Sequence, residues 1–393
     1  MITVEEALAR CFALLSPLPA ETVPLRQASG RVLLAPAVAR LTQPPFDASA
    51  MDGYALGRAG AAGGRYRVIG EAGAGHGFAG QLAPDEATRI FTGAPLPQGA
   101  DTIAIQEDVT ASGTEITVTT ATRPGDNIRK RGQDFAQGDS LSAPRRLRAN
   151  DLALLASMNI PQVAVARRPV VAIIATGDEL VMPGEEPGPD QIVASNLFAL
   201  EALARAEGAE VRLLPIARDS EDELRQVFEL ARGADLIVTI GGASVGDHDL
   251  VGKVAADLGL ERAFWKIAMR PGKPLMAGRL GDAVMLGLPG NPVSAIVCGH
   301  LFLLPMLRAM QGLPGAPAPT ARAVLAEDVS AAGPRVHYMR ARLSPGDGLP
   351  QIAPFTSQDS ALLRILTEAD ALLIRPLGDG PRRAGEMVEY LPI

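Results

Sequence analysis

The chain has 393 residues, more than one ordinary hydrophobic core organises, so we expect two to four domains. Its residues are 47% hydrophobic but only 4% aromatic, which is typical of globular packing built from aliphatic side chains. The formal net charge of −7 provides no general electrostatic attraction to nucleic acid or to an anionic membrane, so we exclude both as general partners.

The cysteines and the apolar runs bear on the compartment. Cys11 and Cys298 have no metal-ligand spacing, and the amino terminus lacks a basic region followed by an apolar core. The apolar run 293–304 is shorter than the roughly 18 residues that cross a bilayer. We therefore predict a soluble, cytoplasmic protein without a membrane segment, in which both thiols are buried.

The first part of the chain predicts a helix, then a small β domain, then a second helix. Residues 3–15 have apolar side chains at helical spacing behind a Thr3 cap. Residues 46–54 predict a polar loop, and residues 148–160 return to helical spacing, with Asn150 or Asp151 as the cap. The short β-rich runs between the helices are 65–69, 87–91, 102–106 and 115–119.

Strands and helices then alternate from residue 170 to residue 311, which predicts a doubly wound α/β domain. Ser195 and Ser220 are the expected caps of its first two helices, and a long apolar helix from Pro292 to about Met310 ends it. The other expected elements are strands 170–176, 210–216, 235–240, 264–269, 275–277 and 284–288, and helices 195–207, 221–232 and 249–258.

A proline- and glycine-rich linker, residues 312–319, follows the long helix. Beyond it the pattern predicts a terminal β domain with strands at 321–328, 336–343, 371–374 and 387–390.

Two strands of the central block end in glycines and carboxylates. The first ends before Asp178 and Glu179, and the second before a glycine-rich turn followed by Asp247 and Asp249. An acidic pair at one strand end is usually a plain polar turn, but two such ends at one sheet edge favour a shared divalent-cation site. Because the N–H groups of the glycine-rich turn suit a phosphate, the crevice predicts phosphate chemistry.

A cluster of cations lies further along the same block. Lys266, Arg270 and Lys273 surround a Pro-Gly-Lys-Pro segment, which in an acidic protein favours an anion cradle over a solvated edge. The turn 288–292 begins a helix whose dipole and free N–H groups also favour an anion. Two anion-binding devices are therefore expected beside the acidic crevice.

Six segments, in this order, closely resemble the molybdopterin molybdenumtransferase family, the MoeA type that is also seen as the E domain of gephyrin and of its plant counterpart. The likeness covers nearly the whole chain. The segments are 45–55 (PFDASAMDGYA), 92–95 (TGAP), 127–129 (NIR), 176–180 (TGDEL), 241–246 (GGASVG) and 287–292 (GLPGNP).

The resemblance implies a multidomain α/β plus β fold: a central doubly wound molybdopterin-binding α/β domain, a small inserted β domain and a C-terminal β-barrel domain. It also implies a homodimer whose active site lies between the α/β domain of one subunit and the amino-terminal domains of the other. The implied boundaries are 1–44 with 134–166 for the elongated N-terminal domain, 45–133 for the insertion, 167–312 for the α/β domain and 318–393 for the barrel.

The family inserts molybdate into adenylylated molybdopterin and releases AMP, with Mg²⁺ as cofactor. The enzyme that adenylylates molybdopterin is a further expected partner. Thr92 lies in the motif that is expected to reach across the dimer cleft.

Site roles are carried over by motif. The acidic set for catalysis is Asp52, Asp134, Glu179 and Asp249, with Glu179, Asp247 and Asp249 as expected metal ligands. The expected substrate-binding set is Thr92, Asp178, Gly241, Gly242, Ser244, Gly246, Lys266, Pro289, Gly290, Asn291 and Pro292. The expected molybdate pocket is Arg270, Lys273, Pro274, Ser294, Arg335 and Ser360.

Two residues depart from the family pattern. Ala48 stands where the family usually has asparagine, and Arg270 where many members have lysine. Arginine keeps the positive charge but presents a planar fork, so the affinity or preference for an oxyanion can differ.

Three alternatives stay open. A tungstate-inserting paralogue would use an oxyanion of nearly the same size and charge. The molybdopterin adenylyltransferase resembles residues 170–311 alone, but it needs neither the segment 51–54 nor two β domains. A non-enzymatic scaffold of the gephyrin kind is disfavoured because the acidic and basic site residues are retained.

Overall fold

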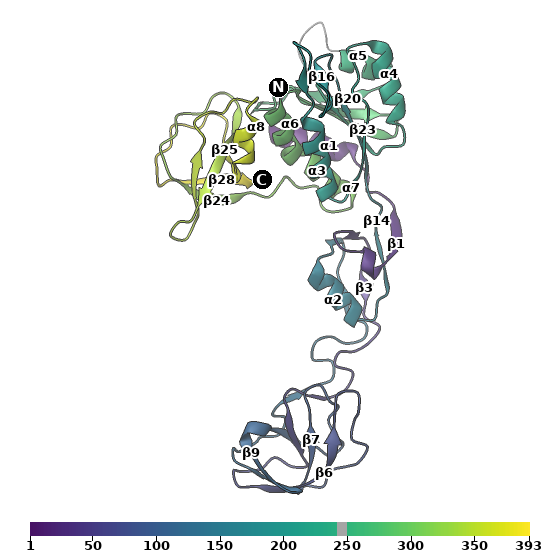
Figure 1. The fold of residues 1–393 in the computed structure, drawn as a ribbon, viewed down its shortest axis with the longest axis vertical. Helices are drawn as coiled ribbons and strands as arrows, with labels where there is room; N and C mark the ends of the chain where they lie inside the picture. The colour runs from purple at the N-terminus through teal and green to yellow at the C-terminus, as the bar shows by residue number, and fades with distance from the viewer. Residues whose placement is uncertain (242–249) are drawn as a thin grey trace.

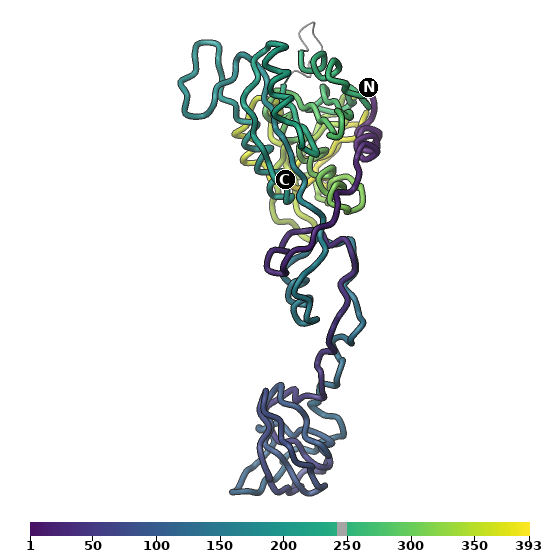
Figure 2. Tube along the Cα trace, turned by 90° about the vertical axis from the view of Figure 1, so that its right-hand side faces the viewer, coloured from purple at the N-terminus to yellow at the C-terminus, as the bar shows by residue number. Residues whose placement is uncertain are grey.

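The computed structural model describes residues 1–241 and 250–393 as an elongated molecule (Figure 1). An α/β part and a barrel lie beside each other at one end, a small β part lies at the other, and a narrow segment joins them. A view turned by 90° shows the same separation of the two ends (Figure 2). We call the small β part and the narrow segment together the arm.

The far end of the arm is a six-stranded sheet that contains all four strands predicted there. The loop predicted over residues 46–54 is wrong at its end, because strand β5 lies inside this sheet. A Cβ on Gly53 would lie 2.0 Å from the carbonyl oxygen of Ala104, so only glycine permits this strand approach. In spatial order the strands are β8 (Thr102–Ile105), β5 (Gly53–Leu56), β7 (Glu86–Ile90), β6 (Arg65–Ala72), β10 (Glu115–Val118) and β9 (Val109–Ser112).

The middle of the arm is a four-stranded antiparallel sheet built by chain from both sides of the insertion. Its order is β1 (Ala20–Pro24), β14 (Gln162–Ala166), β2 (Val32–Leu33) and β13 (Arg145–Arg146). Three further strand pairs are β3 (Ala37–Val38) with β12 (Ser140–Leu141), β4 (Ala48–Ser49) with β11 (Ile128–Arg129), and β16 (Leu180–Val181) with β17 (Ile192–Val193). The exact domain boundaries stay a prediction.

The central block forms a six-stranded mixed sheet. Its order is β18 (Glu210–Leu213), β15 (Val170–Ala175), β19 (Leu236–Ile240), β23 (Ala283–Leu288), β22 (Met276–Leu280) and β20 (Glu261–Trp265), of which the first four are parallel. Alternate residues of β15 point into two cores, which gives the doubly wound arrangement that the sequence predicts. One core packs α1 (Val4–Leu14), α3 (Asn196–Ala206) and α6 (Pro292–Cys298), and the other packs α4 (Glu221–Leu230) and α5 (Leu250–Asp257).

The expected strand ends and helix caps are confirmed in some details and corrected in others. The strand predicted at 264–269 breaks at Lys266, which has φ 66°, and resumes as β21 (Met269–Arg270). The caps Thr3 and Ser220 are confirmed, because each hydroxyl accepts a first-turn N–H group. Ser195 is the residue before the first turn of α3, as predicted, but within the described residues its side chain makes no capping hydrogen bond.

The cap expected at Asn150 or Asp151 is also displaced. Helix α2 (Ala149–Ser157) begins earlier, because the Asp151 carboxylate accepts the backbone N–H of Arg148 at 2.8 Å. Arg148 is therefore the residue that precedes the first helical turn.

The helix predicted from Pro292 is present as α6, a π-helical turn (Gly299–Leu303) and α7 (Leu304–Met310). Contrary to the expectation from sequence, its 19 residues are long and apolar enough to cross a membrane, with a mean hydropathy of 1.7. However, 78% of the apolar window is buried inside the protein, as in the core helix of a folded domain. Cys11 and Cys298 are both buried, as predicted.

The C-terminal part is a closed five-stranded barrel. The bonded order is β25 (Val336–Ser344), β26 (Gln351–Pro354), β24 (Ala321–Leu325), β28 (Met387–Pro392) and β27 (Ala371–Arg375), and β27 pairs back to β25. Strand β26 and the short helix α8 (Leu363–Thr367) were not predicted from the sequence. Strand β21 pairs in parallel with β25, so the cationic segment of the α/β part is tied directly to the barrel.

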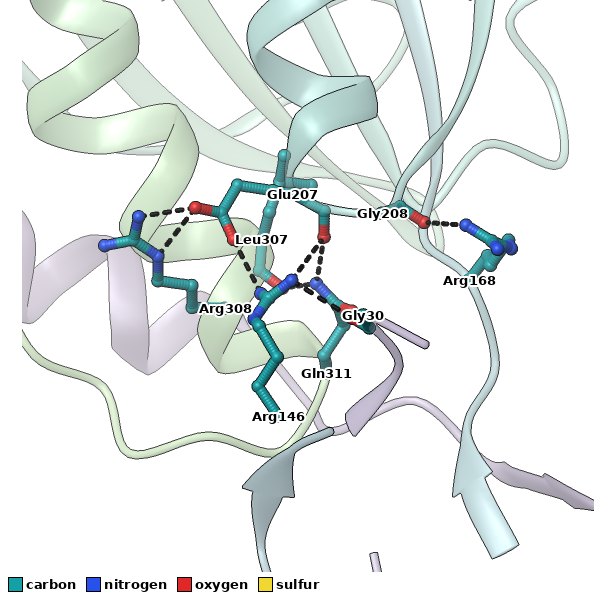
Figure 3. Close-up of polar contacts among 8 residues, drawn as sticks. All are labelled: Gly30, Arg146, Arg168, Glu207, Gly208, Leu307, Arg308 and Gln311. Carbon is teal, nitrogen blue, oxygen red and sulfur yellow. Dashed lines mark hydrogen bonds and ion pairs between the residues drawn. The ribbon is translucent and has the colours of Figure 1, made fainter. Parts of the chain in front are cut away.

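A polar junction centred on Glu207 holds the arm against the α/β part (Figure 3). The Glu207 carboxylate pairs with Arg146 of the arm at 2.6 Å and with Arg308 of α7, and only 12% of its side chain is exposed. Gln311 donates to the Glu207 carbonyl at 2.8 Å, and Arg146 also donates to Gly30 at 3.3 Å. One carboxylate therefore joins side chains from both parts.

Replacing Glu207 with alanine should destabilise the fold by about 2 kcal/mol, because two half-buried guanidinium groups then face each other without a carboxylate. The urea unfolding midpoint, followed by circular dichroism, measures this loss. The control is Glu229→Ala, which breaks an exposed pair with Arg232 that should contribute less than about 1 kcal/mol. Equal midpoints for the two variants would contradict a stabilising role of the junction.

Candidate functional site

A cavity of about 620 Å³ lies at the carboxyl ends of β15 and β19. Because β15 pairs with β18 on one side and β19 on the other, this is the position where strand order reverses and where α/β sheets bind ligands. The volume lies within the usual range for small-molecule sites. Seven of the residues singled out from sequence line it: Glu179, Gly241, Pro274, Pro289, Gly290, Asn291 and Pro292.

Glycines make the floor of this cavity. Gly241 has φ 95°, and a Cβ there would lie 2.8 Å from the Thr176 carbonyl oxygen. A Cβ on Gly290 would lie 3.6 Å from the Gly241 Cα, an ordinary contact distance, so the backbones of the two glycines lie beside each other. Side chains at either position would fill the space that the two strand ends leave open.

Two helices point their amino termini at the cavity. Helix α3 begins at Asn196 and α6 begins at Pro292, and both residues line the cavity. The Asn196 amide donates to the Gly290 carbonyl at 2.7 Å, which holds the two helix starts together. The positive ends of two helix dipoles therefore face one space, which favours a bound anion.

The acidic turn after β15 divides into two roles. The Asp178 carboxylate accepts the N–H of Asp219 at 3.0 Å, and Arg218 donates to the carbonyls of Asp178 and Leu180 at 2.9 Å each. Glu179 and Asp219 are the carboxylates that line the cavity. Asp219 was missed from sequence because nothing in the local pattern distinguishes it from an ordinary helix-start residue.

The cationic segment borders the same space. Pro274 lines the cavity, and the neighbouring Lys273 side chain makes no ion pair with a carboxylate in the part of the chain that the structure describes; the same is true of Arg270. Arg335 donates to the Met269 carbonyl at 3.4 Å, which places it beside β21. Ser294 is buried in the first turn of α6.

Ser360 joins this group from the barrel, since its carbonyl accepts the N–H of Val293 at 3.1 Å. The predicted molybdate residues thus lie on three neighbouring elements: β21 with the segment after it, the first turn of α6, and the barrel.

The electrostatic field at β21 is strongly positive. His337 lies opposite Arg270 in the β21–β25 register, and both line a second cavity of about 530 Å³. Burial and then the nearby Arg270 and Arg335 guanidinium groups lower the pKa of His337 to about 4. The imidazole is therefore neutral near pH 7 mainly because it is buried, and the two arginines favour the neutral form further.

Lys266 differs from the other cations. Its Nζ lies 3.8 Å from the ring centroid of Trp265, so the ammonium group stacks on an aromatic face at the start of the segment. Its role in substrate binding stays a prediction.

Asp52 and Thr92 lie together at the far end of the arm. One Asp52 carboxylate oxygen accepts both the N–H and the hydroxyl of Thr92 at 2.8 Å. These bonds lower the pKa of the Asp52 carboxyl below its ordinary value. Asp134 is exposed in the connection to the middle of the arm. Thr92 lies two residues after β7, and Figure 1 shows the sheet that contains β7 at the opposite end of the molecule from α3, whose first residue Asn196 lines the cavity.

Five of the predicted site residues lie outside the described residues. They are Gly242, Ser244, Gly246, Asp247 and Asp249.

Comparison with known proteins gives one consistent family. Family models match residues 2–159 (MoeA N-terminal region, domain I and II), 172–309 (probable molybdopterin binding domain) and 322–393 (MoeA C-terminal region, domain IV). A molybdopterin molybdenumtransferase of Nostoc sp. is 36% identical over 95% of this chain and 89% of its own length. One of Haemophilus influenzae is 37% identical over 79% of this chain and 78% of its own.

A solved structure agrees with these matches. The crystal structure of a molybdopterin biosynthesis MoeA protein from Pyrococcus horikoshii has a TM-score of 0.82 and 31% identity. It covers 100% of this chain and 99% of that chain.

Replacing Thr92 with valine should raise the pKa of the Asp52 carboxyl, because the carboxylate loses the hydroxyl donor and keeps only the backbone N–H. The carboxyl carbon of Asp52, followed by NMR through an acid titration, measures the shift. Thr110→Val, on β9 of the same sheet, is the control. An Asp52 titration curve that is identical in both variants would show that the hydroxyl bond does not stabilise the carboxylate.

Proposed function

Since the chain belongs to the molybdopterin molybdenumtransferase family, and is therefore a transferase of molybdenum cofactor biosynthesis, we propose that it inserts molybdate into adenylylated molybdopterin and releases AMP. The single observation that carries the proposal is the cavity at the strand-order reversal, lined by two helix amino termini and two carboxylates and bordered by cations that make no ion pair within residues 1–241 and 250–393. Phosphate groups and an oxyanion need such an arrangement at the same time.

The residues at the cavity fit a magnesium cofactor. Glu179 and Asp219 offer carboxylate oxygens, and Mg²⁺ in such sites usually takes one or two carboxylates together with substrate phosphates. No group of three or more His, Cys, Asp or Glu side chains that could hold a metal exists among residues 1–241 and 250–393. When bound, Mg²⁺ supplies positive charge that neutralises the phosphoanhydride and the leaving AMP.

Different groups of the chain bind the phosphates and the molybdate. The N–H groups at the start of α3 and the positive end of the α6 dipole receive the phosphates, and the glycine floor lets the phosphates approach the backbone. Lys273, Arg270 and Arg335 hold the doubly charged molybdate beside the first turn of α6. The two negative substrates therefore bind at adjoining places, where one must react with the other.

The arm supports the proposal of an intersubunit site. Asp52 and Thr92 are ionised or polar, exposed and preorganised by mutual hydrogen bonds, but they lie far from the cavity of their own chain. We propose that in a homodimer they complete the cavity of the partner subunit.

The alternatives can be separated by experiment. An adenylyltransferase would consume ATP and molybdopterin, whereas the proposed enzyme consumes the adenylylated product and depends on molybdate. A scaffold would do neither. Activation of an apo-molybdoenzyme, with molybdate and tungstate supplied separately in an extract that lacks this protein, decides between the two oxyanions. We propose cytoplasmic action with the adenylyltransferase as the supplying partner.

Lys273→Ala should raise the molybdate concentration for half-maximal insertion about ten- to a hundredfold, because one charge-assisted contact to the oxyanion is lost, about 1.5–3 kcal/mol. Binding of adenylylated molybdopterin should change less, and high molybdate should restore the rate. Lys253→Ala, whose ammonium pairs with Glu221 on the surface, is the matched control. Unchanged molybdate dependence in the Lys273 variant would move the oxyanion site to another place, most simply to the α6 amino terminus.

Mixing inactive Asp52→Ala and Glu179→Ala subunits should restore part of the AMP release, because one heterodimer cleft then contains both native residues. Subunit exchange is confirmed by differential tags. If exchange occurs and no activity returns, the site is built within one chain.

A further inference from the structure

The loop of residues 355–362, which we call the bridging loop, connects the barrel to the cavity. It follows β26, precedes α8 and has no regular secondary structure. The Ser360 carbonyl accepts the N–H of Val293 in α6, and Ala361 lines the cavity together with Pro274 and Pro292. The position of this loop therefore shapes the side of the cavity where the proposed molybdate residues lie.

One buried arginine makes several hydrogen bonds to this loop. Arg340 on β25 is 1% exposed, and its guanidinium donates to the carbonyls of Leu362 at 3.1 Å and Ser357 at 3.2 Å. Its Nε also donates to the Gln358 side-chain oxygen at 3.4 Å. All three acceptors belong to the bridging loop, near both of its ends.

Gln358, within the loop, makes further hydrogen bonds to β25. Its amide oxygen accepts the backbone N–H of Arg340 at 2.9 Å, and its amide nitrogen donates to the carbonyls of Arg340 at 3.0 Å and Phe355 at 2.8 Å. The glutamine thus forms hydrogen bonds with the strand in both directions, so the loop has one register against β25.

The charge on Arg340 distinguishes it from a purely structural arginine. Arg375 of the same barrel is equally buried, at 2% exposed, but it pairs with Asp379 at 2.7 Å. Arg340 makes no ion pair in the part of the chain described; burial lowers its pKa, and the Asp359 carboxylate of the bridging loop offsets that shift only in part. A buried guanidinium without a close carboxylate is costly unless its N–H groups are hydrogen-bonded, and here the carbonyls of the loop accept those hydrogen bonds.

We propose that Arg340 and Gln358 are positioning residues of the molybdate end of the site: together they hold the bridging loop so that Ser360 and Ala361 stay seated on the first turn of α6. The proposal rests on the proposed function. Neither side chain needs to touch a substrate, because both act through the loop.

Two variants separate charge from position. Arg340→Lys keeps the positive charge but cannot reach three acceptors with a planar fork, and Gln358→Ala keeps Arg340 and removes the amide bridge. Each should raise the molybdate concentration for half-maximal insertion about tenfold or more, while the dissociation constant for adenylylated molybdopterin stays within about twofold and high molybdate restores the rate. Gln358→Glu keeps the acceptor for Arg340 but loses the amide donor to the Arg340 and Phe355 carbonyls, so it should also raise the molybdate concentration for half-maximal insertion.

A second readout does not depend on activity. Hydrogen exchange of the Val293 amide should become faster in Arg340→Lys and Gln358→Ala, because the amide loses its bond to Ser360 when the loop detaches. Arg382→Ala, which removes the hydrogen bonds of another barrel arginine to Asp379 and Glu386, should change neither readout.

The outcomes are distinct. If the wild-type protein forms no product that depends on molybdate, the proposed function is refuted. Hydrogen exchange of the Val293 amide would still test whether Arg340 and Gln358 hold the bridging loop. If Gln358→Ala folds and its Val293 amide exchanges at the wild-type rate, Gln358 does not hold the bridging loop in place. Faster exchange with unchanged molybdate dependence would show that the loop is held for stability alone. If Arg340→Lys does not fold, Gln358→Ala carries both tests.

Discussion

The position of β15 in the central sheet decides where this chain can bind a small molecule. Its chain leaves through α3 on one face of the sheet, while β19 leads to α5 on the other face. Because the two connections diverge, the described residues leave a crevice at the carboxyl ends of the two strands. Gly241 and Gly290 keep the described wall of that crevice free of side chains. The amino terminus of α3 and the Glu179 carboxylate border this crevice because both lie in the connection that follows β15.

The cations near β21 differ from other cations of the chain in having no carboxylate partner within the described residues. Several half-buried or buried arginines elsewhere in this acidic chain are paired with carboxylates, as Arg146 and Arg308 are with Glu207 and Arg375 is with Asp379. Lys273, Arg270 and Arg335 near β21 make no ion pair with a carboxylate within the described residues, and Arg270 and Arg335 add to the effect of burial in lowering the pKa of His337. An oxyanion that enters there replaces water at groups that have no competing carboxylate, which is the physical basis for selective binding in a protein of net charge −7.

The elongated shape separates two polar groups that one chain cannot bring together. Glu179 lies at the cavity, and Asp52 with Thr92 lies at the far end of an arm whose root is held by the Glu207 junction (Figure 3). Because the Glu207 junction fixes where the arm joins the α/β part, it also fixes the direction of the arm. A fixed direction is needed if the far end of the arm is to meet a second subunit. The same reasoning explains why the arm is attached by charged side chains as well as by the paired strands β1 and β14.

Much of this protein follows from sequence alone. Period-3.6 and buried-strand patterns predicted the α/β alternation, the Thr3 and Ser220 caps and the cores on both faces, because these depend on neighbouring residues. Specific motifs predicted the family. The loop predicted over residues 46–54 failed at Gly53, where a neighbouring strand and not the local pattern makes the β conformation favourable. The long helix from Pro292 looked too short to cross a membrane, yet only its burial against the sheet distinguishes it from such a helix.

The site itself needed the tertiary structure. Sequence order could indicate that Glu179 and the cations near Lys273 are special, but not that Asp219 shares the cavity, that Asp52 is remote from it, or that Arg340 holds the loop carrying Ser360. These relations join residues tens to hundreds of positions apart, and each is set by which strand pairs with which. Local residue patterns determine elements because their energies are local, whereas a site is a set of distances that exists only after long-range packing has been settled.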